Sequence, residues 1–126
     1  MNMGTNKRIL VIDDDSQTRG FVKVILEKAG HQVVTSKNGK EGVVKFRKEA
    51  FNLVITDISM PVINGLDAIV LIRKENPTIP IIAMSGVERS LSFLKMADYF
   101  TADATIQKPF EPKTLAAMVK KVLKAG

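Results

Sequence analysis

Short runs of apolar residues, rich in isoleucine and valine, recur along the chain and alternate with segments of helical periodicity. Runs of this length and composition are typical of strands that are buried on both faces of a sheet. The pattern predicts five strands, at Arg8 to Ile12, Gln32 to Thr35, Leu53 to Thr56, Ile81 to Met84 and Ala104 to Gln107.

The segments between these strands place apolar residues at the spacing of amphipathic helices. We expect Asp15 or Ser16 to cap the first helix, and Asn38 with Glu41 to begin the second as a capping box. A fourth helix is expected at about 88–100, and Pro112 stands in the first turn of the last one. The residues that carry the helical spacing are Thr18, Phe21, Val22, Ile25 and Ala29, then Val43, Phe46 and Ala50, then Gly65, Ala68, Ile69 and Ile72, and finally Leu115, Met118, Val119 and Val122.

Five alternations of strand and helix predict an α/β fold. Right-handed crossovers place helices on both faces of a parallel sheet, so we expect a doubly wound (βα)5 sandwich of three layers with strand order 2-1-3-4-5. Ligands of such sheets bind at the carboxyl ends of the strands.

Composition narrows the classes of function. The 126 residues suit a single domain over 1–126, with a core at about 7–124. With no cysteine and only His31 as a histidine, disulfides, thiol chemistry and cysteine zinc sites are excluded. No signal peptide or membrane span is apparent, so a cytoplasmic location is expected. The net charge of +6 raises the question of a nucleic acid or anionic partner, although solvated lysines are the more frequent cause.

Polar residues follow the strands where ligands are expected. The first strand ends in Asp13 to Asp15, the third in Asp57, the fourth in Ser85 and the fifth in Lys108. Two carboxylates about 4 Å apart repel by roughly 4 kcal/mol at an effective dielectric of 20. Either one is protonated or a cation lies among them, and oxygen ligands favour a hard ion such as Mg²⁺ or Mn²⁺.

A cation, an ammonium group and a hydroxyl around one carboxylate suit phosphoryl transfer. The transferred group carries charge on three oxygens, which the cation, Lys108 and Ser85 can neutralise or bind. Asp57 lies between the others in a sheet of this order and is the expected nucleophile, forming an acyl phosphate. Asp15 is expected to cap a helix rather than to bind the ion.

These residues resemble the response-regulator receiver domain, the CheY-like domain of two-component signalling. The resemblance covers about 7–124 and implies a flavodoxin-like, CheY-like sandwich that acts as a phosphorylation-activated switch. The implied protein is not an enzyme beyond weak self-phosphorylation and self-dephosphorylation. The motifs that carry the resemblance are Val11-Ile12-Asp13-Asp14-Asp15, Thr56-Asp57-Ile58-Ser59-Met60-Pro61 with Asn64-Gly65, Met84-Ser85-Gly86 and Lys108-Pro109-Phe110.

The resemblance implies a role for each aspartate. Asp57 would accept a phosphoryl group from a phosphohistidine on a sensor histidine kinase or a histidine phosphotransfer protein. Asp14 and Asp57 would bind Mg²⁺ directly, with the backbone carbonyl of Ser59 as a further ligand and Asp13 acting largely through water. Lys108 would pair with Asp57 and with the phosphoryl group.

The resemblance also implies a switch. Ser85 would move toward the phosphate, and the bond between Lys108 and Pro109 would be cis. Thr105 stands where many relatives have Tyr or Phe, a ring that turns inward with the hydroxyl residue. Because Thr cannot fill the volume of a ring, we expect a smaller rearrangement at the fifth strand and a larger contribution from the helix at 88–100.

Two further positions bear on the lifetime and output of the signal. In the family, the positions of Ser59 and Val87 shape the attack of water on the acyl phosphate. Neither residue is an acid or an amide, so a long-lived phosphoryl state is expected.

The helix at 88–100, the fifth strand and the last helix would form the surface that binds a downstream partner.

Three other classes of protein fit these residues less well than the receiver does. A haloacid-dehalogenase-like phosphohydrolase would use Asp13 as nucleophile and Asp15 as acid, but only Glu111 follows Lys108 where a second acidic pair is needed. A flavodoxin-like carrier needs a hydroxyl-rich phosphate loop, and the three aspartates would repel the phosphate. A DNA-binding regulator would need an effector domain, which we do not expect, and direct binding of nucleic acid is not expected either.

Overall fold

Five parallel strands form one sheet in the order β2-β1-β3-β4-β5, as predicted. The computed structural model describes residues 6–58, 65–86 and 102–125. Within these residues the strands are β1 (Arg8–Ile12), β2 (Gln32–Ser36), β3 (Leu53–Asp57), β4 (Ile81–Ser85) and β5 (Ala104–Gln107), and the helices are α1 (Ser16–Lys28), α2 (Gly39–Lys48), α3 (Gly65–Glu75) and α5 (Pro112–Ala125). The predicted helix at about 88–100 lies outside the described residues, as do Ser59 and Val87.

Three strands extend one residue beyond the predicted apolar runs, and each added residue is polar. Ser36 extends β2, Asp57 extends β3 and pairs with Met84, and Ser85 extends β4 and pairs with Gln107. Backbone pairing does not depend on the polarity of the side chain, so the ladder continues into these residues. Asp57 and Ser85 are therefore held by the sheet itself.

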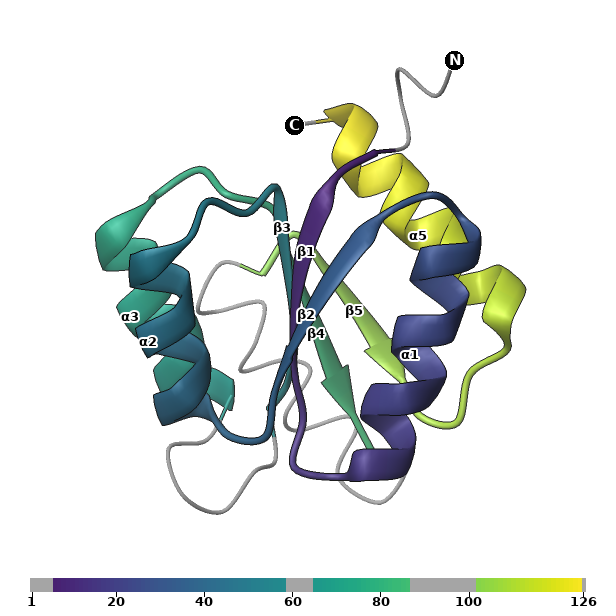
Figure 1. Cartoon of the computed structure of the whole chain (residues 1–126), viewed down its shortest axis with the longest axis horizontal. Coiled ribbons are helices and arrows are strands. Elements are labelled where there is room, and N and C mark those ends of the chain that lie inside the picture. The colour runs from purple at the N-terminus through teal and green to yellow at the C-terminus, as the bar shows by residue number, and fades with distance from the viewer. Residues whose placement is uncertain (1–5, 59–64, 87–101, 126) are drawn as a thin grey trace.

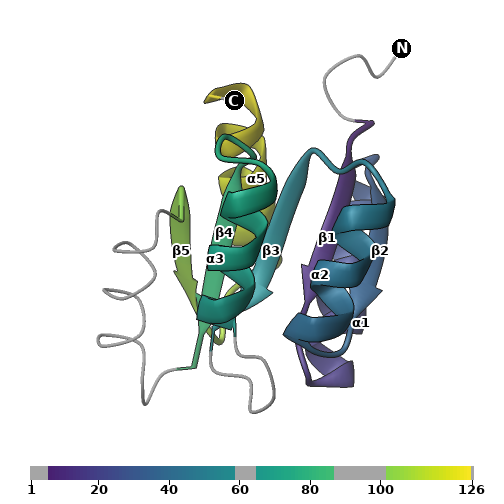
Figure 2. The same ribbon diagram turned by 90° about the vertical axis from the view of Figure 1, so that its left-hand side faces the viewer.

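The helices cover both faces of the sheet and complete the three layers. Helices α1 and α5 lie on one face, and α2 and α3 lie on the other (Figures 1 and 2). Side chains of β1 alternate between the two: Ile9 and Val11 pack with α1 and α5, whereas Leu10 and Ile12 pack with α2 and α3. All four are fully buried, as expected for a strand covered on both faces.

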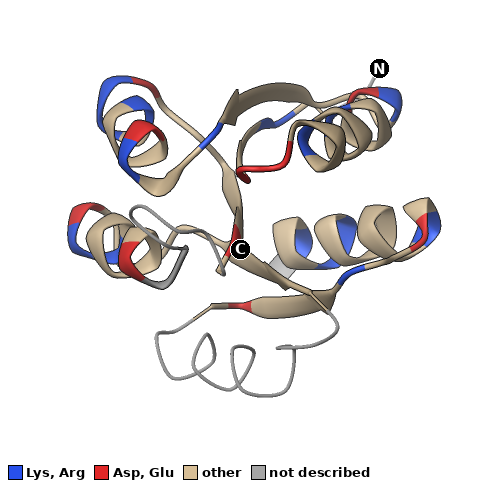
Figure 3. Cartoon of the chain, turned by 90° about the horizontal axis from the view of Figure 1, so that it is seen from below, with Lys and Arg blue, Asp and Glu red and all other residues tan. Residues whose placement is uncertain are grey.

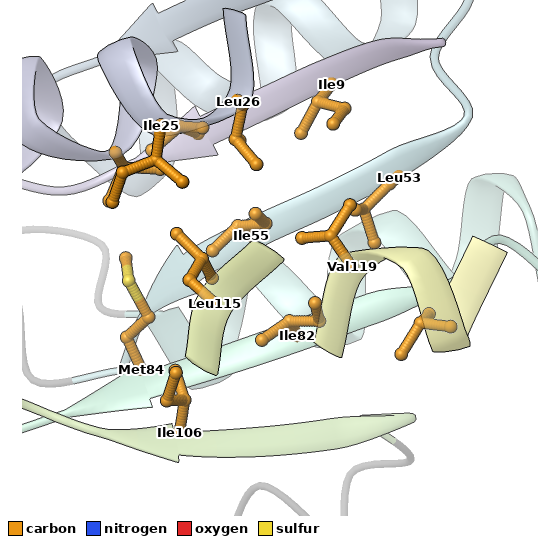
Figure 4. Close-up of a cluster of buried hydrophobic side chains, with 13 residues drawn as sticks. Ile9, Ile25, Leu26, Leu53, Ile55, Ile82, Met84, Ile106, Leu115 and Val119 are labelled. Carbon is orange, nitrogen blue, oxygen red and sulfur yellow. The ribbon is translucent and has the colours of Figure 1, made fainter. Parts of the chain in front are cut away.

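The core between the sheet, α1 and α5 fixes the position of the central strands. Figure 4 shows Leu26 of α1 together with Leu115 and Val119 of α5 beside Ile55 and Ile82 of the sheet. Complete burial of one such side chain stabilises the fold by roughly 1.5–3 kcal/mol. The strand ends, where the polar residues lie, are thus anchored by a rigid apolar layer.

The helix starts agree with the sequence. Asp15 caps α1, since its carboxylate accepts hydrogen bonds from the backbone N–H groups of Gln17 and Thr18 and, at 2.7 Å, from the Thr18 hydroxyl. Asn38 caps α2 by accepting the N–H of Glu41 at 2.8 Å. Both caps bind N–H groups that the helix cannot pair internally.

The inward stripe of α1 is shifted from the predicted one. Val22 and Ile25 are buried, but Phe21 is 44% exposed, with its ring centroid 5.9 Å from that of Phe110 at the edge of the layer. Leu26 is fully buried instead, because it lies four residues after Val22 on the same face of the helix.

One core prediction in the second helix is wrong. Helix α2 ends at Lys48, and Glu49 is extended with φ −132° and ψ 155°, so the exposed Ala50 lies beyond the helix and outside its stripe. Val43 of the same stripe is buried. In α3 and α5 the buried members of the predicted stripes are Ala68, Ile69, Ile72, Leu115, Val119 and Val122. None of the helices in the described part of the chain is long and apolar enough to cross a membrane.

Helix α2 approaches β1 closely at Gly42. A Cβ added there would lie 2.7 Å from the Ile12 Cγ1 atom, closer than side chains pack. Ile12 is fully buried and immediately precedes Asp13. The absence of a side chain at Gly42 therefore lets α2 pack directly over the carboxyl end of β1.

Candidate phosphoacceptor site

The sheet brings four of the predicted site residues to one edge. Asp13 directly follows β1, Asp57 and Ser85 are the last residues of β3 and β4, and Lys108 directly follows β5. Because all strands are parallel, these positions share the carboxyl edge of the sheet. Viewed from that edge, the acidic segment after β1 lies near the middle of the molecule (Figure 3).

Lys108 bridges two of the carboxylates. Its ammonium Nζ donates a hydrogen bond to Asp13 Oδ2 at 2.7 Å and another to Asp57 Oδ2 at 3.0 Å. The Asp13 side chain is fully buried, the Asp57 side chain is 5% exposed and that of Lys108 is 21% exposed. Charge-assisted hydrogen bonds of this length inside a low-dielectric site fix the orientation of all three side chains.

The backbone and one further side chain hold Asp13 in place. Asp13 Oδ1 accepts the backbone N–H of Asp15 at 2.9 Å, which turns the chain into α1. The Arg19 guanidinium donates to the backbone carbonyl of Asp13 at 2.7 Å. Arg19 was not among the predicted site residues, because a contact with a backbone carbonyl leaves no pattern of residue types in the sequence.

Burial and neighbouring charges act in opposite directions on the pKa values of Asp13 and Lys108. Burial raises the pKa of Asp13 to about 6, against the hydrogen bond from Lys108, which lowers it. Burial alone would lower the pKa of Lys108, but the hydrogen bonds and negative charges of Asp13 and Asp57 outweigh it and raise this pKa above its ordinary value. Lys108 is therefore a permanent cation, whereas the charge on Asp13 is costly.

The carboxylates lie close enough together to hold a divalent ion. One oxygen each of Asp13, Asp14 and Asp57 lies within 4.8 Å of the others, with Asp14 exposed to solvent. Lys108 neutralises only one of the three negative charges of Asp13, Asp14 and Asp57. The net charge of −2 that remains is the charge that one Mg²⁺ ion would balance. The donor set is all oxygen, as Mg²⁺ and Mn²⁺ prefer, and the exposed Asp14 leaves room for the waters that Mg²⁺ retains. The residues present thus fit the expected ion.

The remaining predicted residues flank this cluster. Ser85 is fully buried, and its backbone carbonyl accepts the N–H of Lys108 at 2.7 Å, which joins β4 to the lysine. The bond between Lys108 and Pro109 is cis. Thr105 is half-buried and pairs with Ala83, three residues before Lys108 along β5.

The Asp15 carboxylate is engaged at the helix cap, and His31 lies apart from the site. A hydrogen bond from the Thr18 hydroxyl lowers the pKa of Asp15, in keeping with its position as a helix cap. His31 precedes β2 at the opposite edge of the sheet, where its Nδ1 accepts the backbone N–H of Lys7 at 3.3 Å.

Comparison with known proteins agrees with this geometry. The family model of the response regulator receiver domain matches residues 9–120. The chemotaxis protein CheY of Thermotoga maritima is 34% identical over 119 residues, which cover 94% of this chain and 98% of that protein. A probable transcriptional regulator ycf27 of Porphyra purpurea is 35% identical over 120 residues, but the match spans 48% of that protein. The chain thus spans about half the length of the first curated relatives that it matches.

Solved structures give the same picture. A CheY-like receiver domain protein of Methanospirillum hungatei has a TM-score of 0.86 at 32% identity, with 95% of each chain covered. A receiver domain protein of Clostridium thermocellum has a TM-score of 0.87 at 29% identity, covering 94% of this chain and 95% of that one. These matches lend no support to a haloacid-dehalogenase-like hydrolase. The fold, the acidic edge and the family match together place this chain in the family of CheY-like response regulator receiver domains.

Proposed function

We propose that the chain is a phosphoacceptor switch in which Asp57 receives a phosphoryl group from a histidine kinase or a histidine phosphotransfer protein. The observation that carries the proposal is the bridge from Lys108 to Asp13 and Asp57 at the carboxyl edge of the sheet. It joins a fixed cation to the acidic group of Asp13 and to the candidate nucleophile Asp57. We further propose that residues 7–124 form one receiver unit.

The transfer step follows from the chemistry of these groups. A carboxylate oxygen of Asp57 attacks the phosphorus of a phosphohistidine, the new P–O bond forms and the P–N bond breaks. The electron pair of that bond leaves with the imidazole, which takes up a proton from solvent. Lys108 neutralises charge on the phosphoryl oxygens, and the hydroxyl of Ser85 donates a hydrogen bond to one of them.

A divalent cation completes the charge balance of the site. Asp14 and Asp57 would hold Mg²⁺ directly, with the carbonyl of Ser59 as a further ligand and Asp13 bound through water. When bound, the ion supplies positive charge beside the transferring phosphoryl group. Asp13 and Asp57, which both accept a hydrogen bond from Lys108, would then share it with the phosphate.

Phosphorylation would be read out by altered binding of a downstream protein. The proposed output surface comprises β5, α5 and the predicted helix at about 88–100. Thr105 contributes a small side chain to β5, so we propose that the loop after β4 carries more of the rearrangement than β5 does. A cytoplasmic location, where the phosphoryl donors act, accords with this role.

Intact-protein mass spectrometry tests the proposal. The chain is incubated with acetyl phosphate and Mg²⁺, and the mass of one added phosphoryl group is expected. Asp57→Asn should abolish the adduct because the amide is not a nucleophile here. Asp15→Asn is the matched control: it makes the same change of charge, keeps a good helix cap and should retain the adduct.

Two results would contradict the proposal. An adduct that persists in Asp57→Asn would move the acceptor to another residue. Multiple turnover of acetyl phosphate that depends on Asp13 as nucleophile, with phosphate trapped on Asp13, would identify a hydrolase instead. Repeating the reaction with EDTA checks the ion, since the adduct should then fall to background.

A further inference from the structure

A second feature lies at the opposite edge of the sheet from the acidic cluster. A groove of about 490 Å³ runs between the end of α1 and the last turns of α5. Its apolar surface includes Ala29, Ala116 and Leu123, and its charged residues are Lys7, Lys120 and Lys124. None of the described residues that line it is acidic. In Figure 1 the last turns of α5 lie next to the start of β1.

The three lysines are available for a partner. Elsewhere in the described residues, several basic side chains have acidic neighbours, such as Arg47 with Glu75 and Arg73 with Asp103. None of the described carboxylates forms an ion pair with Lys7, Lys120 or Lys124. Lys120 and Lys124 are exposed and lie one helical turn apart on α5, so their ammonium groups line the same side of the groove.

We propose that this groove docks an acidic segment of a partner protein that also carries apolar side chains. Apolar side chains of the segment would contact the alanines and Leu123, while its carboxylates would pair with the lysines along the rim. Such pairing adds specificity and speeds association through long-range attraction. The inference goes beyond the proposed phosphoacceptor function and does not rest on it.

Charge complementarity favours this occupant over the alternatives. A second copy of the chain would bring another surface of a protein with net charge +6 to a basic groove. Residues 1–5 of the chain carry no charged side chain and so do not complement three lysines. Lysines act as flexible point charges, so they can pair with carboxylates distributed along a peptide.

The position of the groove predicts how binding relates to phosphorylation. Lys7 immediately precedes β1, whereas Asp13 follows it, so the five residues of β1 separate the two sites. Lys7 and Asp13 are thus six residue steps apart, and at about 3.3 Å per residue the separation is roughly 20 Å. A segment in the groove would leave the acidic edge open, so docking is expected in both the free and the phosphorylated states.

The test uses a fluorescein-labelled peptide in which Glu alternates with Leu, at an ionic strength of about 0.15 M. We expect saturable binding by fluorescence anisotropy, with NMR shift changes confined to the groove. The double variant Lys120→Glu with Lys124→Glu should weaken binding by about tenfold or more, because two attractions become repulsions. Lys113→Glu with Lys121→Glu is the matched control on the same helix, since neither residue lines this groove, and its affinity should stay within about threefold.

Four outcomes would overturn the proposal. Equal loss of binding in both double variants would show general attraction to a basic protein. Equal affinity for polyglutamate would show that the apolar surface takes no part. A duplex DNA that binds the same lysines more tightly than the peptide would assign the groove to nucleic acid. A change in peptide affinity of more than about threefold on addition of Mg²⁺ and beryllofluoride would show that the groove is coupled to the acidic edge. Circular dichroism checks that each variant is folded.

Discussion

Removing the negative charge of Asp13 is expected to stabilise the metal-free protein. Burial raises the pKa of this carboxyl from 3.8 to about 6, so the folded state binds its proton more tightly than the unfolded chain does. A pKa difference of one corresponds to about 1.4 kcal/mol, so ionised Asp13 costs the fold about 3 kcal/mol relative to its protonated form. The protonated form of Asp13 therefore contributes stability that is fully present below pH 3.8 and is lost as the pH rises through about 6.

Asp13→Asn should recover part of this free energy. The amide is neutral, but its nitrogen must face one of two donors, the N–H of Asp15 or the ammonium of Lys108. The free energy of unfolding should therefore rise by about 1–2 kcal/mol at pH 7.5, less than the full cost of the charge. Between about pH 4.5 and pH 7.5 the difference between the variant and the natural chain should grow by about 2 kcal/mol.

Urea unfolding in EDTA, followed by far-ultraviolet circular dichroism, measures both quantities. Asp15→Asn is the control, since it makes the same charge change at an exposed helix cap and should alter stability much less than Asp13→Asn does. Added Mg²⁺ should stabilise the natural chain more than the Asp13→Asn variant, because a ligand that binds the folded state stabilises it by mass action. The reasoning is refuted if the variant is less stable than the natural chain at pH 7.5, or if their difference does not change with pH.

Three further results are expected. Gly42→Ala should lower the free energy of unfolding by about 1–3 kcal/mol in urea melts, because the added Cβ would collide with the Ile12 side chain. Gly20→Ala, with open space around it, should raise the free energy of unfolding by up to about 1 kcal/mol. Equal effects of the two substitutions would contradict the close packing at Gly42. Lys108→Met should tighten Mg²⁺ binding measured by calorimetry while reducing phosphoryl transfer, and a weaker Mg²⁺ affinity would show that the lysine does not compete with the ion. In crystals of the free and beryllofluoride-bound forms Thr105 should keep its rotamer, and a swing to another rotamer would assign it a direct part in the switch.

The strands were predictable because their signals are local and strong, and their order because few topologies suit such a chain. Each strand is a short apolar run, and the number of alternations with helices leaves few topologies for a parallel sheet. The gathering of Asp13, Asp57 and Lys108 followed from the same topology, since parallel strands bring their carboxyl ends together. The hydrogen-bond partners of these side chains could not be predicted from the sequence, because they depend on the three-dimensional arrangement of the strand ends.

The features that were not predicted correctly from the sequence all depend on tertiary structure. The exposure of Phe21 depends on how α1 is rotated against the sheet, which a residue spacing alone does not determine. The early end of α2 at Lys48 places Ala50 outside the core although its type and spacing fit. Arg19 contacts a backbone carbonyl, and such contacts leave no pattern of residue types in the sequence.

The bridge made by Lys108 also has a consequence for the folding of the chain. Lys108 is separated from Asp13 by 95 positions and from Asp57 by 51, so the bridge is among the contacts of longest range in the fold. Contacts of this kind close large loops and form late, after local helices and neighbouring strands. A nascent or partly unfolded chain would bring the aspartates together without their cation. The proposed competence to receive a phosphoryl group would therefore be acquired only once the last strand has joined the sheet, and signalling would be restricted to molecules that have completed their fold.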